Sequence, residues 1–251
     1  MEADPEWWVW IPKAVWRIGG RYILFASLAF LFFYVWKKDT FQTRKIQPRF
    51  PKASDYQREI AFSVLTILIF GVIVAFILQS PTIRPYTLLM PTPDFHGWFY
   101  YVLVFPVMLF VHDTYFYWAH RWMHMPFWYR KVHTIHHRST NPSPWAAYSF
   151  HPWEALIEIG ILPIFVFGFP VHRNHIMLFF LFMIVYNVYG HLGFELYSQG
   201  FEKTRIGRWI NTSRHHNLHH SRFTGNYGLY FLFWDRWMGT IRNDMLDNEK
   251  P

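Results

Sequence analysis

Histidines are concentrated in a few short segments of the chain. Nine of the 15 histidines lie in residues 120–137 and 215–220, in the patterns "HRWMH", "HTIHH" and "HNLHH". Residues three or four positions apart share one face of a helix, with Cβ atoms roughly 5 to 6 Å apart. Each pattern therefore directs two or three imidazoles toward one point, as metal ligation requires. The histidines are His120 and His124; His133, His136 and His137; and His216, His219 and His220, with His215 just before them.

The number and type of these side chains limit the kind of site. Eight or more imidazoles exceed the four to six ligands, roughly, of a single ion, which predicts two metal ions. The chain has no cysteine, so thiolate ligands and disulfides are excluded. It contains no HExxH and no Glu-x-x-His, which argues against a zinc peptidase of that type and against a carboxylate di-iron bundle. Imidazole suits iron, zinc, copper and nickel, and composition does not choose among them.

Non-catalytic proteins also bind metals or haem through histidine. A metal transporter would hold its ligands at the membrane midplane, and a bis-histidine haem protein would need ligand pairs on separate helices. A structural zinc site needs four ligands, about half of those present here. A non-catalytic metal- or haem-binding membrane protein is therefore the alternative, and an enzyme is favoured.

The composition predicts that the elements carrying these histidines lie in a membrane. Of 251 residues, 52% are hydrophobic and only 16% are charged, and the aromatic share is 22%. Tyr and Trp favour the bilayer interface, where one edge of the ring is dry and the other wet. The net charge of +8 is explained by loops that face anionic lipid, so no nucleic-acid partner is predicted.

Apolar runs predict an all-α polytopic membrane protein of four to five membrane helices with a helical, histidine-rich cap. We interpret residues 1–251 as a single membrane domain, with N-terminal anchor helices in 1–96 and a histidine-box catalytic region in 97–251. The last two runs are short and are expected to form a hairpin. We expect "EWWVW" near the N-terminus to be an interfacial anchor. The runs cover residues 22–36, 60–78, 97–120, 154–169 and 175–191.

Basic residues predict which side of the membrane the cap occupies. Lys and Arg number seven in 37–58, four in 121–138 and eight in 203–250, against one in 79–96 and one in 170–174. The positive-inside rule places the rich segments, and with them the histidine boxes, in the cytoplasm. Three basic residues before the first apolar run weigh weakly against this orientation. The host membrane is predicted to be a bacterial inner membrane or the endoplasmic reticulum.

The motifs resemble those of the membrane-bound fatty acid hydroxylase and sterol desaturase superfamily. The similarity extends from Asp113 to Thr240 and includes "HDTYFYWAHRWMH", "HTIHHRS", "HPWE", "GHLGFE", "HHNLHHSRFTGNYG" and "FWDRWMGT". The resemblance implies an all-helical enzyme that holds two irons on the cytosolic side. It also implies the use of O2 and electrons to hydroxylate, oxidise or desaturate a fatty acyl chain or sterol, with hydroxylation placed ahead of desaturation. Zinc can replace iron in a purified sample.

The resemblance also assigns roles to individual residues. It gives the ligand role to the eight box histidines other than His215, and adds His191 as a ninth ligand. Fatty acid 2-hydroxylases of this superfamily often have a histidine at the position of Asn187, so Asn187 is expected to bind through water or not at all. The sequence contains no cytochrome b5 domain, so we expect a separate electron donor of cytochrome b5 or ferredoxin type.

Residues around the boxes are candidates to hold the ligands in place. Metal-bound imidazoles usually donate their second N–H to a carboxylate or carbonyl. Asp113, two helical turns before His120, and Glu154 are the expected carboxylate partners. His151 is either a ligand or a helix-start residue packed on Trp153. His112 is expected to pack or hydrogen-bond, and Asp235 to pair with a basic residue.

Overall fold

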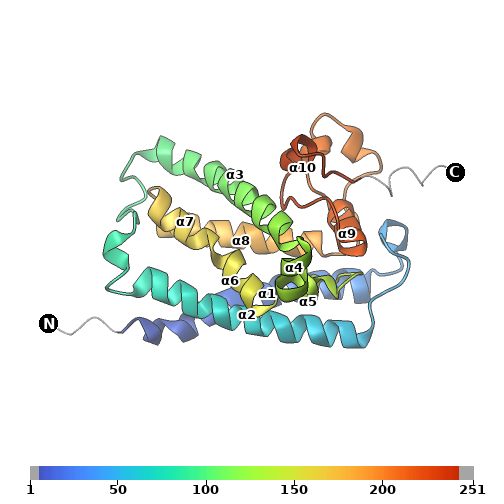
Figure 1. Cartoon of the computed structure of the whole chain (residues 1–251), viewed down its shortest axis with the longest axis horizontal. Helices are drawn as coiled ribbons and strands as arrows, with labels where there is room; N and C mark the ends of the chain where they lie inside the picture. Colours follow the sequence, from blue (N-terminus) through green and yellow to red (C-terminus); the bar gives the residue numbers. More distant parts are fainter. Residues whose placement is uncertain (1–5, 243–251) are drawn as a thin grey trace.

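The computed structural model describes residues 6–242, and within this range all regular elements are helical. Three long helices, α1 (Ile11–Phe30), α2 (Ala53–Gln79) and α3 (Trp98–Met123), run in alternating directions (Figure 1). A 3₁₀ turn, Trp7–Trp10, leads into α1, and a π-helical turn, Leu31–Trp36, prolongs it. All three helices are long and apolar enough to cross a membrane. The prediction of an all-α integral membrane protein is confirmed.

Helices α1 and α2 begin before the apolar runs of the sequence, because their first turns also contain polar side chains. The first helix begins at Ile11 rather than near residue 22, and α2 begins at Ala53 rather than near residue 60. The Asp55 side chain accepts a hydrogen bond from the Lys52 N–H at 3.0 Å, and this hydrogen bond fixes the start of α2. Further along α2, the buried carboxylate of Glu59 accepts a hydrogen bond from the Ser143 hydroxyl.

Two shorter arms form the predicted hairpin. One arm consists of α6 (Pro152–Ile159) and α7 (Ile161–Gly168), and the other is α8 (Arg173–Gly190). At the break between α6 and α7, the Tyr115 hydroxyl donates to the Ile157 carbonyl at 2.7 Å. A Cβ on Gly160 would collide with this hydroxyl. The arms are not among the three candidate spans, so how many helices cross the bilayer stays a prediction.

The segments that carry the three histidine boxes meet at one end of the bundle. This cap contains α4 (Pro126–Trp128), α5 (Thr134–His137), α9 (Ser213–Arg222) and α10 (Phe233–Trp237), drawn at the right of Figure 1. The loop after α1 joins it, because the Ile46 N–H donates to the Gly193 carbonyl at 3.0 Å. The loops between α2 and α3 and between α7 and α8 meet at the opposite end, where the Leu88 N–H donates to the Val166 carbonyl at 2.6 Å. The described basic segments therefore gather at the histidine end.

Close contact between α1 and α2 depends on a glycine. A Cβ on Gly71 would lie 3.2 Å from the backbone nitrogen of Val15 and closer still to its side chain. Backbone atoms cannot move aside without shifting a whole helix, so position 71 has no room for a side chain. Gly20, in α1, has no atom within 4 Å of the position of an added Cβ.

We predict that Gly71→Ala lowers the thermal stability of the detergent-purified protein, because overpacking costs about 1 to 3 kcal/mol. Gly20→Ala is the matched control and should be neutral or stabilising by up to about 1 kcal/mol, since alanine has the higher helix propensity. Thermal unfolding of both variants measures the difference. Equal melting temperatures would contradict the packing argument.

Candidate metal centre

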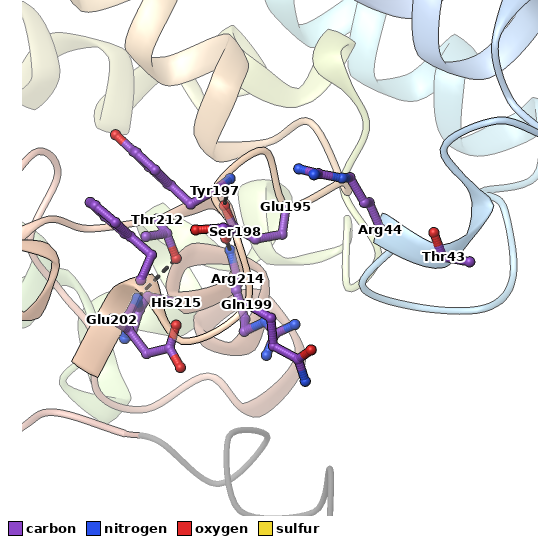
Figure 2. A pocket seen from close by; sticks show the side chains of 11 residues that line it. Thr43, Arg44, Glu195, Tyr197, Ser198, Gln199, Glu202, Thr212, Arg214 and His215 are labelled. Atoms are coloured by element: carbon purple, nitrogen blue, oxygen red, sulfur yellow. Dashed lines mark hydrogen bonds between the residues drawn. The ribbon is translucent and has the colours of Figure 1, made fainter. Parts of the chain in front are cut away.

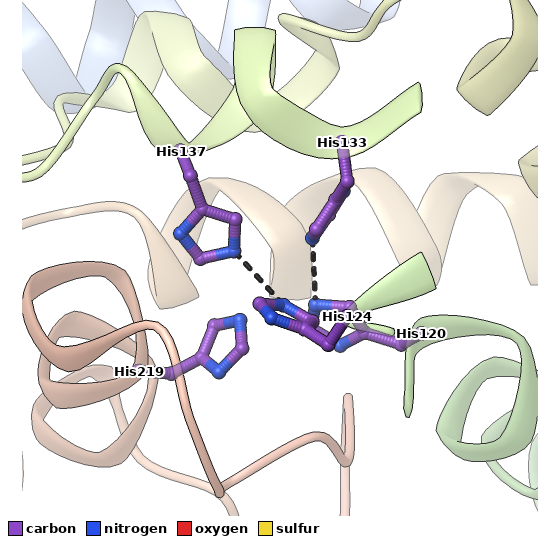
Figure 3. Close-up of side chains that lie close together, drawn as sticks. All are labelled: His120, His124, His133, His137 and His219. Carbon is purple, nitrogen blue, oxygen red and sulfur yellow. Dashed lines mark hydrogen bonds between the residues drawn. The ribbon is translucent and has the colours of Figure 1, made fainter. Parts of the chain in front are cut away.

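Five imidazoles from three parts of the chain form the first histidine group. Figure 3 shows their rings converging from the end of α3, from the segment that ends in α5, and from α9. One nitrogen of each ring lies within 4.8 Å of one nitrogen of each other ring. The Nε2 atoms of His120 and His133 are 3.1 Å apart, as are those of His124 and His137. The group comprises His120, His124, His133, His137 and His219.

Four further imidazoles form the second histidine group, and all are buried. The Nε2 atom of His191, at the end of α8, lies 3.1 Å from that of His216 and 3.2 Å from that of His220. His220 and His216 are themselves 3.2 Å apart at Nε2, and His136 completes the group at 3.4 Å from His191.

The paired histidines of the two HxxHH boxes explain why the groups are adjacent. Consecutive helical residues project about 100° apart, because a turn holds 3.6 residues. Accordingly His136 joins the second group and His137 the first. His219 and His220 divide in the same way, with His219 in the first group and His220 in the second. Each box therefore supplies both groups, and the rings of His137 and His220 lie only 4.8 Å apart.

Hydrogen bonds at Nδ1 determine where the imidazole protons lie. Backbone carbonyls only accept, so a ring whose Nδ1 faces a carbonyl must be protonated there and bare at Nε2. This applies to His120 with Tyr227 at 2.9 Å, and to four other rings. These are His219 with Gly225 at 2.7 Å, His220 with Ser139 at 3.0 Å, His191 with Asn187 at 2.8 Å and His136 with Ser149 at 3.4 Å.

The resulting arrangement fits metal cations. The unprotonated Nε2 lone pair of His191 faces those of His220 and His136 at 3.2 and 3.4 Å, and they would repel without positive charge between them. Burial holds the pKa of His219 and of His220 well below the usual value for histidine, so protonation does not supply that charge. Neutral imidazole is also the ligand form. The donor set is entirely nitrogen, which suits iron, zinc, copper or nickel.

Comparison with known proteins identifies the family. Residues 105–240 match the fatty acid hydroxylase family. The chain belongs to the fatty acid hydroxylase family. All nine histidines of the two groups lie within the matched region, and α1 and α2 lie outside it.

Several proteins similar to this chain have the names of enzymes that act on sterols. Two proteins of Gibberella zeae, each named Delta(7)-sterol 5(6)-desaturase, are 30% identical over 228 residues and 32% identical over 224 residues. These alignments cover 90% and 88% of this chain, and 67% and 59% of the relatives. Lathosterol oxidase of Rattus norvegicus is 31% identical over 229 residues, covering 89% of this chain and 72% of the relative. No solved structure matches the chain. Family and relatives together indicate an oxidoreductase that acts on a lipid.

Of the two carboxylates expected to hold ligands, Glu154 does so. Its Oε1 lies 2.7 Å from Nδ1 of His133, in the first group. Among the described residues no hydrogen bond joins Asp113 to a histidine, so the structure does not support its expected role. Its Oδ1 instead accepts the backbone N–H groups of residues 229, 230 and 231 at 3.2, 2.7 and 3.2 Å. Three successive amides of one turn therefore share one carboxylate oxygen.

The loop held by Asp113 matters for the metal centre because it supplies carbonyls to ligands. Its neighbour Asp235 accepts the N–H groups of Tyr227 and Gly228, both at 2.9 Å, and the Thr240 hydroxyl at 2.7 Å. The sequence prediction that Asp235 pairs with a basic residue is therefore replaced by a role in fixing the loop. The carbonyl of Tyr227 is the one that orients His120.

The remaining candidates lie beside the groups rather than in them. His151 caps α6, with Nδ1 accepting the Trp153 N–H at 3.3 Å, and Asn187 uses its side-chain amide to donate to the Ala147 carbonyl at 2.8 Å. His215 lies 3.0 Å from the Thr212 hydroxyl in the wall of a cap pocket of about 410 Å³ (Figure 2). His112 lies 3.0 Å from the Tyr230 hydroxyl, as its predicted hydrogen-bonding role requires.

Support of the centre by α2 is not indicated by any sequence pattern. Arg58 donates to the Ser139 hydroxyl at 3.1 Å, and the carbonyl of the same serine receives the Nδ1 proton of His220. An ion pair with Asp55 at 2.7 Å holds the Arg58 guanidinium. No motif connects residue 58 to the boxes, since the contact spans 81 positions in sequence.

We predict that His219→Ala and His136→Ala each reduce bound metal by about one equivalent per chain, because each removes a ligand from a different group. Metal content of the purified protein, measured by mass spectrometry, tests this. His96→Ala, in the loop between α2 and α3, is the control and should retain wild-type metal content. Full metal loading in both ligand variants would contradict the assignment.

We predict that Glu154→Gln weakens metal binding by roughly 10- to 100-fold, the usual effect of losing a partner of a ligand histidine. The amide can donate to His133 Nδ1, which would leave the proton on the ligand atom. Competition with a chelator measures the affinity. Glu202→Gln, for which no contact with either group is found among the described residues, should behave as wild type. Unchanged chelator resistance in the Glu154 variant would count against this role.

Proposed function

We propose that this chain is a membrane-bound non-haem di-iron enzyme that oxidises a lipid with O2. The observation that carries the proposal is the pair of buried histidine groups with bare, converging Nε2 atoms at the end of an apolar helical bundle. The first group would hold one iron and the second the other. Zinc would fit the same donors and can replace iron during purification.

Bound iron would supply the activation of O2 that an inert C–H bond requires. The protein's contribution is placement. Carbonyls keep the protons of His120 and His219 at Nδ1, and Glu154 does the same for His133. The aromatic rings of Phe116 and Phe150 lie 5.0 and 5.2 Å from ligand rings and form an apolar boundary of the centre on its core side.

The substrate is proposed to be a sterol or a related lipid, and the reaction the formation of a C=C bond. Support comes from the printed names of the relatives, which are sterol desaturases and a sterol oxidase. Hydroxylation, which the sequence analysis placed first, is the second candidate and is supported by the name of the matching family. Both reactions begin with removal of a hydrogen from carbon, so the same centre serves either.

Electrons are proposed to come from a separate protein of cytochrome b5 or ferredoxin type. The described segments at the histidine end carry 18 Lys and Arg residues, counted from 37 to 58, 121 to 138 and 203 to 242. Such a surface favours an acidic donor. The same basic segments support a cytoplasmic orientation of the cap, in the endoplasmic reticulum or a bacterial inner membrane.

We predict that the iron-loaded protein, supplied with O2, a reductase system and a Δ7-sterol, releases a product that lacks two hydrogens or contains one added oxygen. His216→Ala should lower turnover by roughly 100-fold or more, because a ligand of the second group is lost. Mass spectrometry of the extracted lipid distinguishes the two products, and His96→Ala is the control. Undiminished turnover in His216→Ala would contradict the proposed function.

A further inference from the structure

A small cavity lies between the two histidine groups and the apolar core. Its volume is about 10 Å³, room for about one water-sized group. Members of both groups are in contact with residues of its wall. These contacts are Phe116 with His120 at 5.0 Å between ring centres, Phe150 with His136 at 5.2 Å, and the carbonyl of Asn187 with Nδ1 of His191 at 2.8 Å.

The wall is mostly apolar, and Glu158 is the acidic side chain in it. Phe70, Phe180 and Met183 line the same cavity and come from α2 and α8. Glu158 lies one turn after Glu154 on α6, on the core side of the metal centre. Within residues 6–242, no hydrogen bond or ion pair to its carboxylate is found. Glu158 is half-buried, and a carboxylate beside an apolar cavity is costly unless it has a partner, and it often marks a functional site.

Two other polar side chains of the wall, His112 and Asn187, each use only one of their hydrogen-bonding atoms. His112 uses Nδ1 in its contact with the Tyr230 hydroxyl, and across the described residues Nε2 has no partner. Asn187 donates through its amide nitrogen to Ala147, and within the described range its side-chain oxygen accepts no hydrogen bond. Polar atoms from α3, α6 and α8 therefore line one apolar cavity with unused hydrogen-bonding capacity.

We propose that Glu158, with His112 and Asn187, forms the polar end of the lipid-binding site and receives a hydroxyl group of the substrate. A hydroxyl group is about as large as a water molecule, so it fits this cavity. A hydroxyl has one proton and two lone pairs, so it can donate to the Glu158 carboxylate while it accepts from a protonated His112 Nε2 and from the second amide N–H of Asn187. A plain acyl chain has no atom that would satisfy them. The inference rests on the proposed lipid oxidation and narrows its substrate to a hydroxylated lipid such as a 3-hydroxysterol.

A fixed hydroxyl would also determine which carbon reacts. In a rigid polycyclic lipid the hydroxyl and each ring carbon are a constant distance apart, so anchoring one places the others. The aromatic side chains of the wall must change conformation to admit the ring system, whereas Glu158 keeps its position on α6. Glu158 is thus a positioning and specificity-determining residue, distinct from the histidines that hold metal.

The test is equilibrium binding to the metal-loaded protein in lipid nanodiscs. A Δ7-3-hydroxysterol and its 3-methyl ether compete against a photoreactive sterol in wild type, Glu158→Leu and Glu158→Gln. Wild type should bind the alcohol roughly 10- to 100-fold more tightly than the ether, the effect of a hydrogen bond to a charged group. The Leu variant should lose this preference, chiefly by weaker binding of the alcohol. The Gln variant, which retains an acceptor, should keep part of it.

Controls separate recognition from folding. Metal content and melting temperature should match wild type in both Glu158 variants, and Leu156→Ala, on the lipid-facing side of the same helix with 40% of its surface exposed, should keep the preference for the alcohol. If Glu158→Leu retains the preference, or if wild type binds alcohol and ether equally, the inference is wrong while the proposed function stands. If wild type binds and oxidises only acyl lipids without a hydroxyl, the inference and the proposed sterol substrate both fail.

Discussion

Mutual repulsion of imidazole lone pairs is the constraint on which the rest of the structure depends. Nine rings, of which eight are buried and His124 is half-buried, converge in the two groups, and the Nδ1 atoms of five of them face carbonyls that leave no other position for the proton. Packing alone would not hold such an arrangement, because each neutral ring loses hydration and gains no donor for its bare nitrogen. Metal cations would convert the same geometry from repulsive to strongly favourable. Folding of the cap and metal binding should therefore be closely coupled.

The surrounding protein is organised to keep these rings in register. Asp113 and Asp235 accept five backbone N–H groups of the loop 227–231, which contributes a carbonyl to His120. From the other side, Arg58 of α2 secures Ser139, whose carbonyl serves His220. The membrane helices thus do more than anchor the cap. They fix the ends from which the ligand segments start, and they carry polar groups to the boundary between core and cap.

The sequence was informative wherever a local pattern determines geometry. The HxxHH spacing predicts rings on one helical face, and the division of His136 and His137 between two groups follows from the helical repeat. The ligand set itself came from resemblance as well as spacing, since His191 belongs to no box. Glu154 was predicted because it follows a histidine-containing motif and a ligand needs a carboxylate.

The remaining contacts depend on tertiary structure that no local pattern encodes. Asp113 has the right helical phase to reach His120, but the loop 229–231 packs against it and its amides take the carboxylate. Arg58 and Glu59 lie at the polar start of a helix whose apolar part alone was recognised, so α2 was predicted to begin too late. The unpartnered carboxylate of Glu158 becomes visible only when the walls of its cavity are known.

X-ray absorption at the iron edge, with metal quantified in the same iron-loaded sample, tests the central claim most directly. The account predicts two iron ions per chain, nitrogen-rich coordination and the outer scattering pattern of several imidazoles on each ion. Haem absorption, a coordination sphere without imidazole, or protein that remains folded yet binds no metal at saturating iron would contradict it.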